Sequence, residues 1–146
     1  MTLQEVIDRA DILKPNSYSQ NEKIWWLSCL DGTIYEEIIS THEGGEKVVF
    51  SGYDSKTLLN TQLLVPAPYD EIYIRYLEMQ INYANGEFGK YNNSAKMYEE
   101  AYASFQRYYN RTHMPKGVKF KYFGEPNIKE YQAATSVAKV TIEEDK

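Results

Sequence analysis

The sequence is poor in cysteine, has no long apolar run and carries no excess of positive charge. Cys29 is the single cysteine among 146 residues, which excludes an intrachain disulfide and a cysteine-rich zinc site. No apolar run approaches the ~20 residues that cross a bilayer. The N-terminus lacks the basic start and apolar run of a signal peptide. These features predict a soluble protein of a reducing cytoplasm, without a membrane partner.

The balance of charge is acidic and uneven along the chain. Lys and Arg number 16 against 21 Asp and Glu, a net charge of −5, which is the wrong sign for an autonomous nucleic-acid binder. Residues 1–65 hold five basic and ten acidic side chains, whereas residues 66–146 hold eleven of each. The excess of acid therefore belongs to the N-terminal part of the chain.

Length and composition are those of one globular domain with many tyrosines. A chain of this length buries roughly 70% of its unfolded surface, so it needs no disulfide or metal to fold. Tyrosine accounts for 14 of the 21 aromatic residues. A tyrosine ring can be half buried while its hydroxyl stays in water, which favours a small core with an adhesive surface.

Apolar spacing predicts two helices in the first forty residues. The first covers residues 2–13: it begins with TLQE, which has the form of a capping box, and ends before Pro15. A second box, SQNE at 19–22, begins a helix that runs to about residue 38. Gly32 lies inside this helix, where we expect a kink or a break.

Residues 69–114 predict an antiparallel helical hairpin, which we expect to be the stability core. Pro68 suits the first helical position, and Asn85-Gly86 has the form of a left-handed helix stop. Tyr98 and Phe105 lie centrally in the apolar stripe of the second helix. That stripe consists of Tyr91, Ala95, Tyr98, Tyr102, Phe105 and Tyr109.

Two segments break the helical pattern. Residues 43–66 contain turn signals and two short β-prone runs, at 47–50 and 61–65, which we interpret as a hairpin or functional loop. In the tail, residues 118–123 and 137–142 alternate as strands do. Isolated short strands are marginal in water, so we expect both segments to become ordered on assembly.

The predicted fold class is mainly α. It is an antiparallel bundle of about four helices with a small β element, formed by the insertion at 43–66 and the strand-like C-terminal tail. Residues 1–116 would form the helical domain with its insertion, and 117–146 an extended assembly tail.

No pattern in the sequence supports catalysis, a metal site or a cofactor. There is no phosphate-binding loop, dinucleotide fingerprint or metalloprotease motif. His42 and His113 border turns in different segments, and Cys29 is predicted to be a small buried hydrophobic residue. Adjacent glutamates point ~100° apart on a helix and do not form a facing acid–base pair. We predict no catalytic, metal-binding or cofactor-binding residue.

Five aromatic residues stand outside the helical stripes and are candidates for a subunit interface. Aromatic side chains are enriched at such interfaces, and the chain's own core is an equally good place for them. Stacking of nucleic-acid bases on the tyrosine stripe is a weaker alternative, because as many acids as bases flank it. The five candidates are Trp26, Tyr53, Tyr108, Tyr122 and Phe123.

Residues 66–116 resemble small proteins encoded in the head modules of tailed phages and prophages. The resemblance covers about 50 residues, and its most specific part is YYNRTHMP at 108–115. The other matching phrases are PYDEIY at 68–73, YLE at 76–78, NGE at 85–87 and YNNS at 91–94. Members of that group are similar to head–tail connector, or head-completion, proteins that bind beneath the portal.

The resemblance implies a helical structural subunit without catalytic residues. Such subunits assemble as a homo-oligomeric ring of about a dozen copies, with two different adhesive surfaces on each copy. The implied partners are the portal protein and tail or neck proteins, and DNA passes through the ring without sequence-specific binding. The implied locations are the host cytoplasm during assembly and the head–tail junction of the virion. The alternatives are a tail-completion or other neck protein and, with less support, a single-stranded nucleic-acid-binding module.

Overall fold

The computed structural model describes residues 1–117, and the predicted strands at 118–123 and 137–142 lie outside these residues. The first compact unit of the chain runs from Met1 to Lys116. Its helices are α1 (Leu3–Leu13), α2 (Gln20–Ile34), α3 (Glu71–Ala84) and α4 (Phe88–Thr112), with a π-helical turn η1 (Tyr35–Ile39) and a 3-10 turn η2 (Gly45–Lys47).

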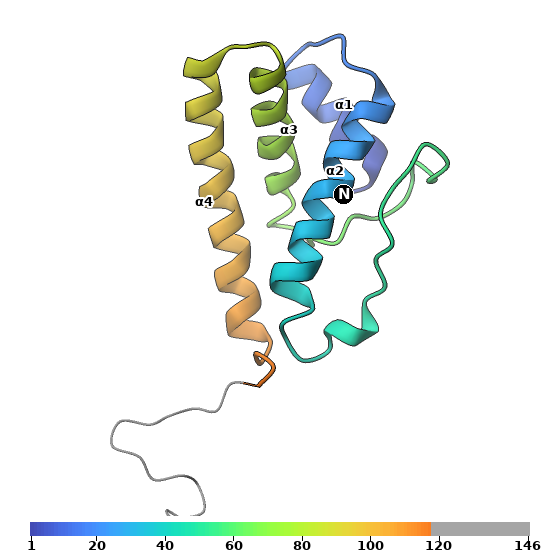
Figure 1. Ribbon diagram of the computed structural model, residues 1–146, viewed down its shortest axis with the longest axis vertical. Coiled ribbons are helices and arrows are strands. Elements are labelled where there is room, and N and C mark those ends of the chain that lie inside the picture. The colour runs from blue at the N-terminus through green and yellow to red at the C-terminus, as the bar shows by residue number, and fades with distance from the viewer. Residues whose placement is uncertain (118–146) are drawn as a thin grey trace, which may run out of the picture. The chain divides into compact units, whose positions relative to one another are not determined.

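The four helices form a bundle, which confirms the predicted mainly α class. α3 is the central helix and contacts α1, α2 and α4, with its most extensive contact against α4 (Figure 1). One hydrophobic core joins buried residues from all four helices. The largest fully buried side chains include Leu3, Leu27, Tyr73, Leu77 and Phe105.

The predicted caps begin the first two helices. The Thr2 hydroxyl accepts from the Glu5 N–H, and the Glu5 carboxylate accepts from the Thr2 N–H, which together form a capping box. The Ser19 hydroxyl accepts from the Glu22 N–H at the start of α2. Each cap satisfies backbone donors that the first turn of a helix leaves without partners.

The predicted break at Gly32 is not present, because α2 continues through Gly32 to Ile34. The irregularity falls immediately afterwards, in the π-helical turn η1. A side chain at Gly32 would meet the Phe50 ring 3.7 Å from its Cβ atom. This distance is an ordinary van der Waals contact, so Phe50 of the 43–66 segment packs on α2 beside Gly32.

The predicted α3–α4 hairpin is present, with a later start than expected. The Tyr69 N–H donates to the Pro66 carbonyl in a turn, and α3 begins only at Glu71. Pro68 therefore lies in the turn that precedes the helix and not at its first position. Between the helices, Gly86 adopts φ +73°, the left-handed conformation that favours glycine and that the sequence predicted.

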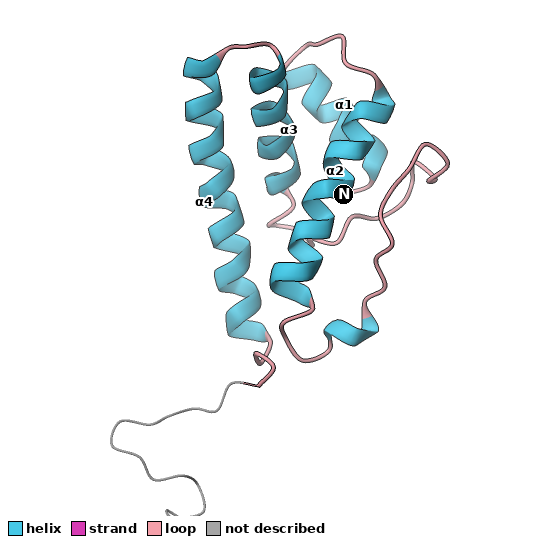
Figure 2. Cartoon of the chain, in the orientation of Figure 1, coloured by secondary structure: helices cyan, strands magenta, loops and turns pink. Residues whose placement is uncertain are grey.

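The insertion at 43–66 contains no β-hairpin, which corrects that part of the predicted small β element; the tail part lies outside the described residues. None of the described residues forms a strand (Figure 2). The backbone of this segment pairs with the start of α1: the Leu3 N–H donates to the Thr61 carbonyl, and the Leu63 N–H donates to the Met1 carbonyl. Its β-prone side chains also serve the bundle core, where Val65 is fully buried.

The same contacts correct the expectation that residues 43–66 become ordered only on assembly. The segment packs on its own domain, and buried polar contacts hold it there. The same expectation covers residues 117–146. Of these only Gly117 is among the described residues.

Candidate functional site

Five tyrosines line the α3–α4 hairpin in two groups of neighbouring rings, which together we call the tyrosine surface. Tyr76 and Tyr83 are seven residues apart, as are Tyr91 and Tyr98, so each pair lies on one side of its helix, and Tyr102 follows Tyr98 after about one turn. Ring centroids are 5.4 Å apart for Tyr83–Tyr91, 5.2 Å for Tyr76–Tyr98 and 6.0 Å for Tyr98–Tyr102. The tyrosine surface consists of Tyr76 and Tyr83 from α3 and Tyr91, Tyr98 and Tyr102 from α4.

Acidic side chains border the tyrosine surface. The Tyr102 hydroxyl donates to the Glu37 carboxylate at 2.6 Å. Burial raises the pKa of Tyr98 above its ordinary value, and the negative charges of Glu37 and Glu99 raise that pKa further. Burial and the bond to Glu37 raise the pKa of Tyr102 in the same way. The tyrosines are therefore neutral at physiological pH, and the surface combines aromatic rings with negative charge.

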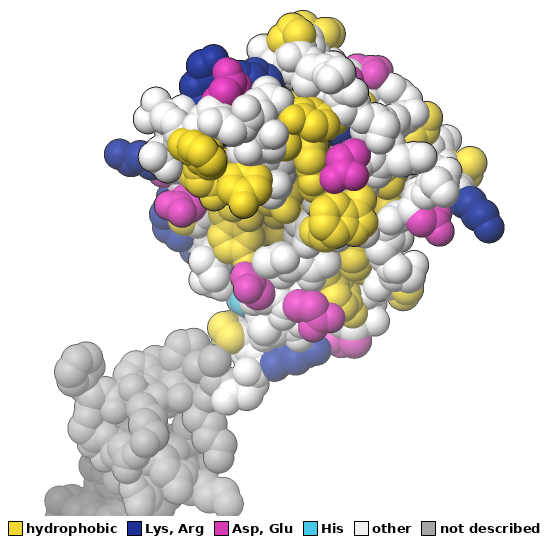
Figure 3. Space-filling model, turned by 45° about the horizontal axis from the view of Figure 1, so that its top comes forward, with side chains coloured by type: hydrophobic (Ala, Val, Ile, Leu, Met, Phe, Trp, Pro, Cys, Tyr) yellow, Lys and Arg dark blue, Asp and Glu magenta, His cyan; other side chains and the backbone are white. Residues whose placement is uncertain are grey.

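Helix α2 has two exposed residues one turn apart, and the second of them lies near this surface. Trp25 is 59% exposed. Cys29 follows one turn later and lies close enough to Tyr76 to raise the pKa of that hydroxyl, although burial of Tyr76 contributes more. Figure 3 shows hydrophobic side chains, tyrosine included, gathered at the centre of the visible face, with acidic side chains among them. An exposed aromatic area of this kind is typical of a protein–protein contact surface.

The exposure of Cys29 corrects the prediction that its thiol is buried. The apolar stripe of α2 passes through Leu27, Leu30 and Ile34, and Cys29 lies outside it. We expect the native protein to react with a maleimide at one thiol per chain, at a rate similar to that of the unfolded protein. A labelling time course followed by mass spectrometry measures both rates. A native rate more than about a hundredfold slower would show a protected thiol and contradict this placement.

The predicted interface aromatics have different environments. Trp26 is 6% exposed and packs edge-to-face on Tyr18, which favours the core over a partner for this residue. Tyr53 is half-buried, and its hydroxyl donates to Asp31. Tyr108 is also half-buried and stacks on Tyr69 with centroids 4.5 Å apart. Tyr122 and Phe123 lie outside the described residues, and the interface role stays a prediction.

Asp31 is a buried polar residue that the sequence analysis missed. Its carboxylate is 0% exposed and accepts from the Tyr53 and Tyr73 hydroxyls, each at 2.6 Å, and from the Leu64 N–H at 3.2 Å. Burial raises the pKa of Asp31, and the three hydrogen bonds oppose that rise without cancelling it. This carboxylate holds the 43–66 segment against α2 and α3. The only sign of this role in the sequence is that Asp31 lies between the apolar residues Leu30 and Ile34 of α2.

A second buried polar group, His42, joins η1 to the end of α4. One ring nitrogen of His42 lies 2.6 Å from the Ile38 carbonyl oxygen, and the other lies 2.8 Å from the Asn110 side-chain oxygen. The His42 ring packs edge-to-face with the Tyr109 ring. The His113 ring stacks on the same Tyr109 ring, with centroids 3.9 Å apart. Both histidines therefore contact Tyr109, and these contacts are ring packing.

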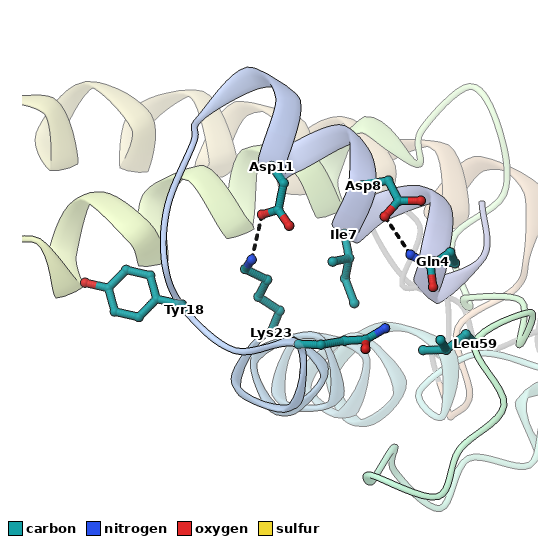
Figure 4. A pocket seen from close by; sticks show the side chains of 8 residues that line it. Gln4, Ile7, Asp8, Asp11, Tyr18, Lys23 and Leu59 are labelled. Carbon is teal, nitrogen blue, oxygen red and sulfur yellow. Dashed lines mark hydrogen bonds and ion pairs between the residues drawn. The ribbon is translucent and has the colours of Figure 1, made fainter.

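A pocket between α1 and α2 has a volume of about 330 Å³ and opens to solvent. Figure 4 shows Lys23 pointing toward Asp11, and Gln4 toward Asp8, in this pocket. The Lys23 ammonium is buried and lies 2.6 Å from the Asp11 carboxylate. The Lys23–Asp11 ion pair joins α2 to α1 at this pocket, whereas the Gln4–Asp8 hydrogen bond lies within α1.

Two further observations concern residues 1–117. No three His, Cys, Asp or Glu side chains within this range lie together in a way that could hold a metal ion. No helix in the same part of the chain is both long enough and apolar enough to cross a membrane. Comparisons with protein-family models, curated proteins and solved structures returned no match for the chain.

Proposed function

We propose that this chain is a structural subunit of a phage head–tail connector, which forms a ring beneath the portal and joins the head to the tail. The observation that carries the proposal is the resemblance of residues 66–116 to that group. The matching phrases fall on α3 and α4, on the turn between them and on the residues directly before α3 and after α4. Two of them, at 76–78 and 91–94, include Tyr76 and Tyr91 of the tyrosine surface.

The surface chemistry supports an assembly role for the hairpin. A rigid pair of helices presents half-buried tyrosines beside exposed carboxylates, and tyrosine supplies contact area with little loss of side-chain freedom. A ring subunit needs two different adhesive surfaces, one for each neighbour. The tyrosine surface is a candidate for one of them.

The experiment that tests this function is assembly on the cognate portal. Purified chain and portal are mixed, the species are separated by size-exclusion chromatography, and light scattering measures the molar mass of each. We expect a complex whose added mass corresponds to about a dozen copies of the chain per portal. Two outcomes would refute the proposal: no co-migration at chain concentrations of about 100 µM, or binding of a single copy.

The nucleic-acid-binding alternative predicts a different result. Phosphate groups are repelled by a chain of net charge −5, and Glu37 and Glu99 lie beside the rings on which bases would stack. We therefore expect single-stranded and duplex oligonucleotides to bind with Kd values weaker than about 1 µM at physiological salt. Fluorescence anisotropy measures this directly. Tighter binding of single strands would favour the alternative over the connector.

A further inference from the structure

We propose that residues 118–122 of one copy bind the tyrosine surface of a neighbouring copy and so form the head-to-tail contact between subunits. This inference rests on the proposed connector function, because only an assembling chain has a neighbour to receive the segment. A head-to-tail contact joins two different surfaces of the same chain, and its repetition closes a ring. The tyrosine surface is one of these surfaces, and the segment supplies the other.

The tyrosine surface selects a partner that is both apolar and basic. Four of its rings are half-buried and that of Tyr83 is exposed. Such rings offer contact area to apolar side chains and attract cations over their faces. The Glu37 carboxylate lies 2.6 Å from the Tyr102 hydroxyl, and Glu99 is an exposed acid that directly follows Tyr98 in α4. A segment that alternates apolar and basic residues satisfies both features at once.

Residues 118–122 have this alternation. Their sequence is VKFKY, in which Lys119 and Lys121 separate three apolar or aromatic residues. The first acid after them is Glu125. An extended backbone directs alternate side chains to opposite sides. The apolar and aromatic row would lie on the tyrosine rings, and the long lysine side chains of the other row would reach the carboxylates at the margin of the surface.

The lengths of the segment and of the surface agree. Five extended residues span about 17 Å. On α4, Tyr91 and Tyr102 are eleven residues apart, which corresponds to a helical rise of about 16 Å. The segment can therefore follow the α4 tyrosines from one end of the surface to the other.

The segment leaves each copy from a fixed place. The Lys116 N–H donates to the Thr41 carbonyl at 2.8 Å, and the Lys116 ammonium lies 3.4 Å from the Glu46 carboxylate. Pro115 forms a backbone bridge with His42. In a ring, every copy would present residue 118 at the same position relative to its neighbour. The 29 residues that follow Gly117 leave ample chain for this contact.

The native Cys29, beside Tyr76, allows a direct test by cross-linking of the full-length chain. A Phe123→Cys variant places a second thiol next to the segment, and a short bismaleimide joins it to Cys29. In the portal-bound chain we expect a ladder of multimers, about tenfold stronger than for the matched tail control Ser136→Cys, because docking raises the local thiol concentration. Wild-type chain, with one thiol, gives at most dimers.

Charge reversal separates specific docking from chance collision. Glu37→Lys in the Phe123→Cys background is expected to reduce the ladder toward the control level, and adding Lys121→Glu is expected to restore it. Equal ladders from positions 123 and 136 would overturn the inference, as would cross-links confined to single chains. If the portal complex forms but the ladder is absent, this inference fails and the connector function stands. If wild-type chain does not assemble on the portal, the connector function itself fails.

Discussion

Replacing Asp31 with alanine is expected to lower the free energy of unfolding by about 3–5 kcal/mol. The substitution removes the buried acceptor shared by the Tyr53 hydroxyl, the Tyr73 hydroxyl and the Leu64 N–H. Tyr73 is fully buried, so solvent does not reach its hydroxyl to replace the lost carboxylate. The loss also releases the 43–66 segment from the helices on which it packs.

Urea unfolding monitored by circular dichroism measures this loss. Glu36→Ala is the matched control, because Glu36 is an exposed acid on the adjoining helical turn, and it is expected to change stability by less than about 0.5 kcal/mol. Tyr53→Phe removes one of the three donors and is expected to cost about 1–3 kcal/mol. A loss below about 1 kcal/mol for Asp31→Ala would show that this network does not hold the fold together.

The raised pKa of Asp31 also predicts a pH dependence. Its ordinary value is 3.8, and burial raises it in the folded chain, so the folded state holds the proton more tightly than the unfolded state does. The stability that this group contributes is fully present below 3.8 and falls as pH rises through the folded pKa. Wild type should therefore lose free energy of unfolding relative to Asp31→Asn as pH rises. A flat difference would contradict the assignment.

Replacing Phe105 with alanine is expected to cost about 3–5 kcal/mol as well. Phe105 is 1% exposed and lies among the rings of Tyr69, Tyr108 and Tyr109, with centroid distances of 5.8–6.3 Å. Alanine leaves a cavity at the contact between α4 and the core, and rigid aromatic neighbours cannot close it. Thermal and urea unfolding both report this loss.

Two positions on the same helix serve as comparisons for Phe105. Tyr98 is half-buried on the tyrosine surface, so Tyr98→Ala is expected to cost less, about 1–2 kcal/mol. Gln106 is exposed, and Gln106→Ala is expected to change stability by less than about 0.5 kcal/mol. Equal small losses at positions 98 and 105 would mean that the hairpin is not the stability core.

Local sequence signals predicted the helices well because their physical causes are local. The capping box at Thr2, the hydroxyl cap at Ser19, the spacing of apolar residues and the turn at Asn85-Gly86 each act within a few residues. The α3–α4 hairpin follows from the short turn between two amphipathic stripes.

The errors arose where a partner is distant in sequence. Asp31 accepts from tyrosines 22 and 42 residues away, and nothing near it distinguishes a buried acid from a solvated one. The β-prone residues of 43–66 do prefer extended backbone, but their hydrogen-bond partner is the start of α1 and not a second strand. Cys29 was misplaced for a different reason, because its apolar neighbour Leu30 points into the core while Cys29 does not.

Amide hydrogen exchange of the full chain, free and bound to the portal, tests the account most directly. We expect slow exchange in α3 and α4 in both states, because this hairpin is the stable scaffold. Assembly should add strong protection at 118–122 and at residues bordering the tyrosine surface, including Glu37. Identical profiles for the free and portal-mixed chain would contradict the assembly role, and fast exchange throughout α4 in the free chain would contradict the scaffold.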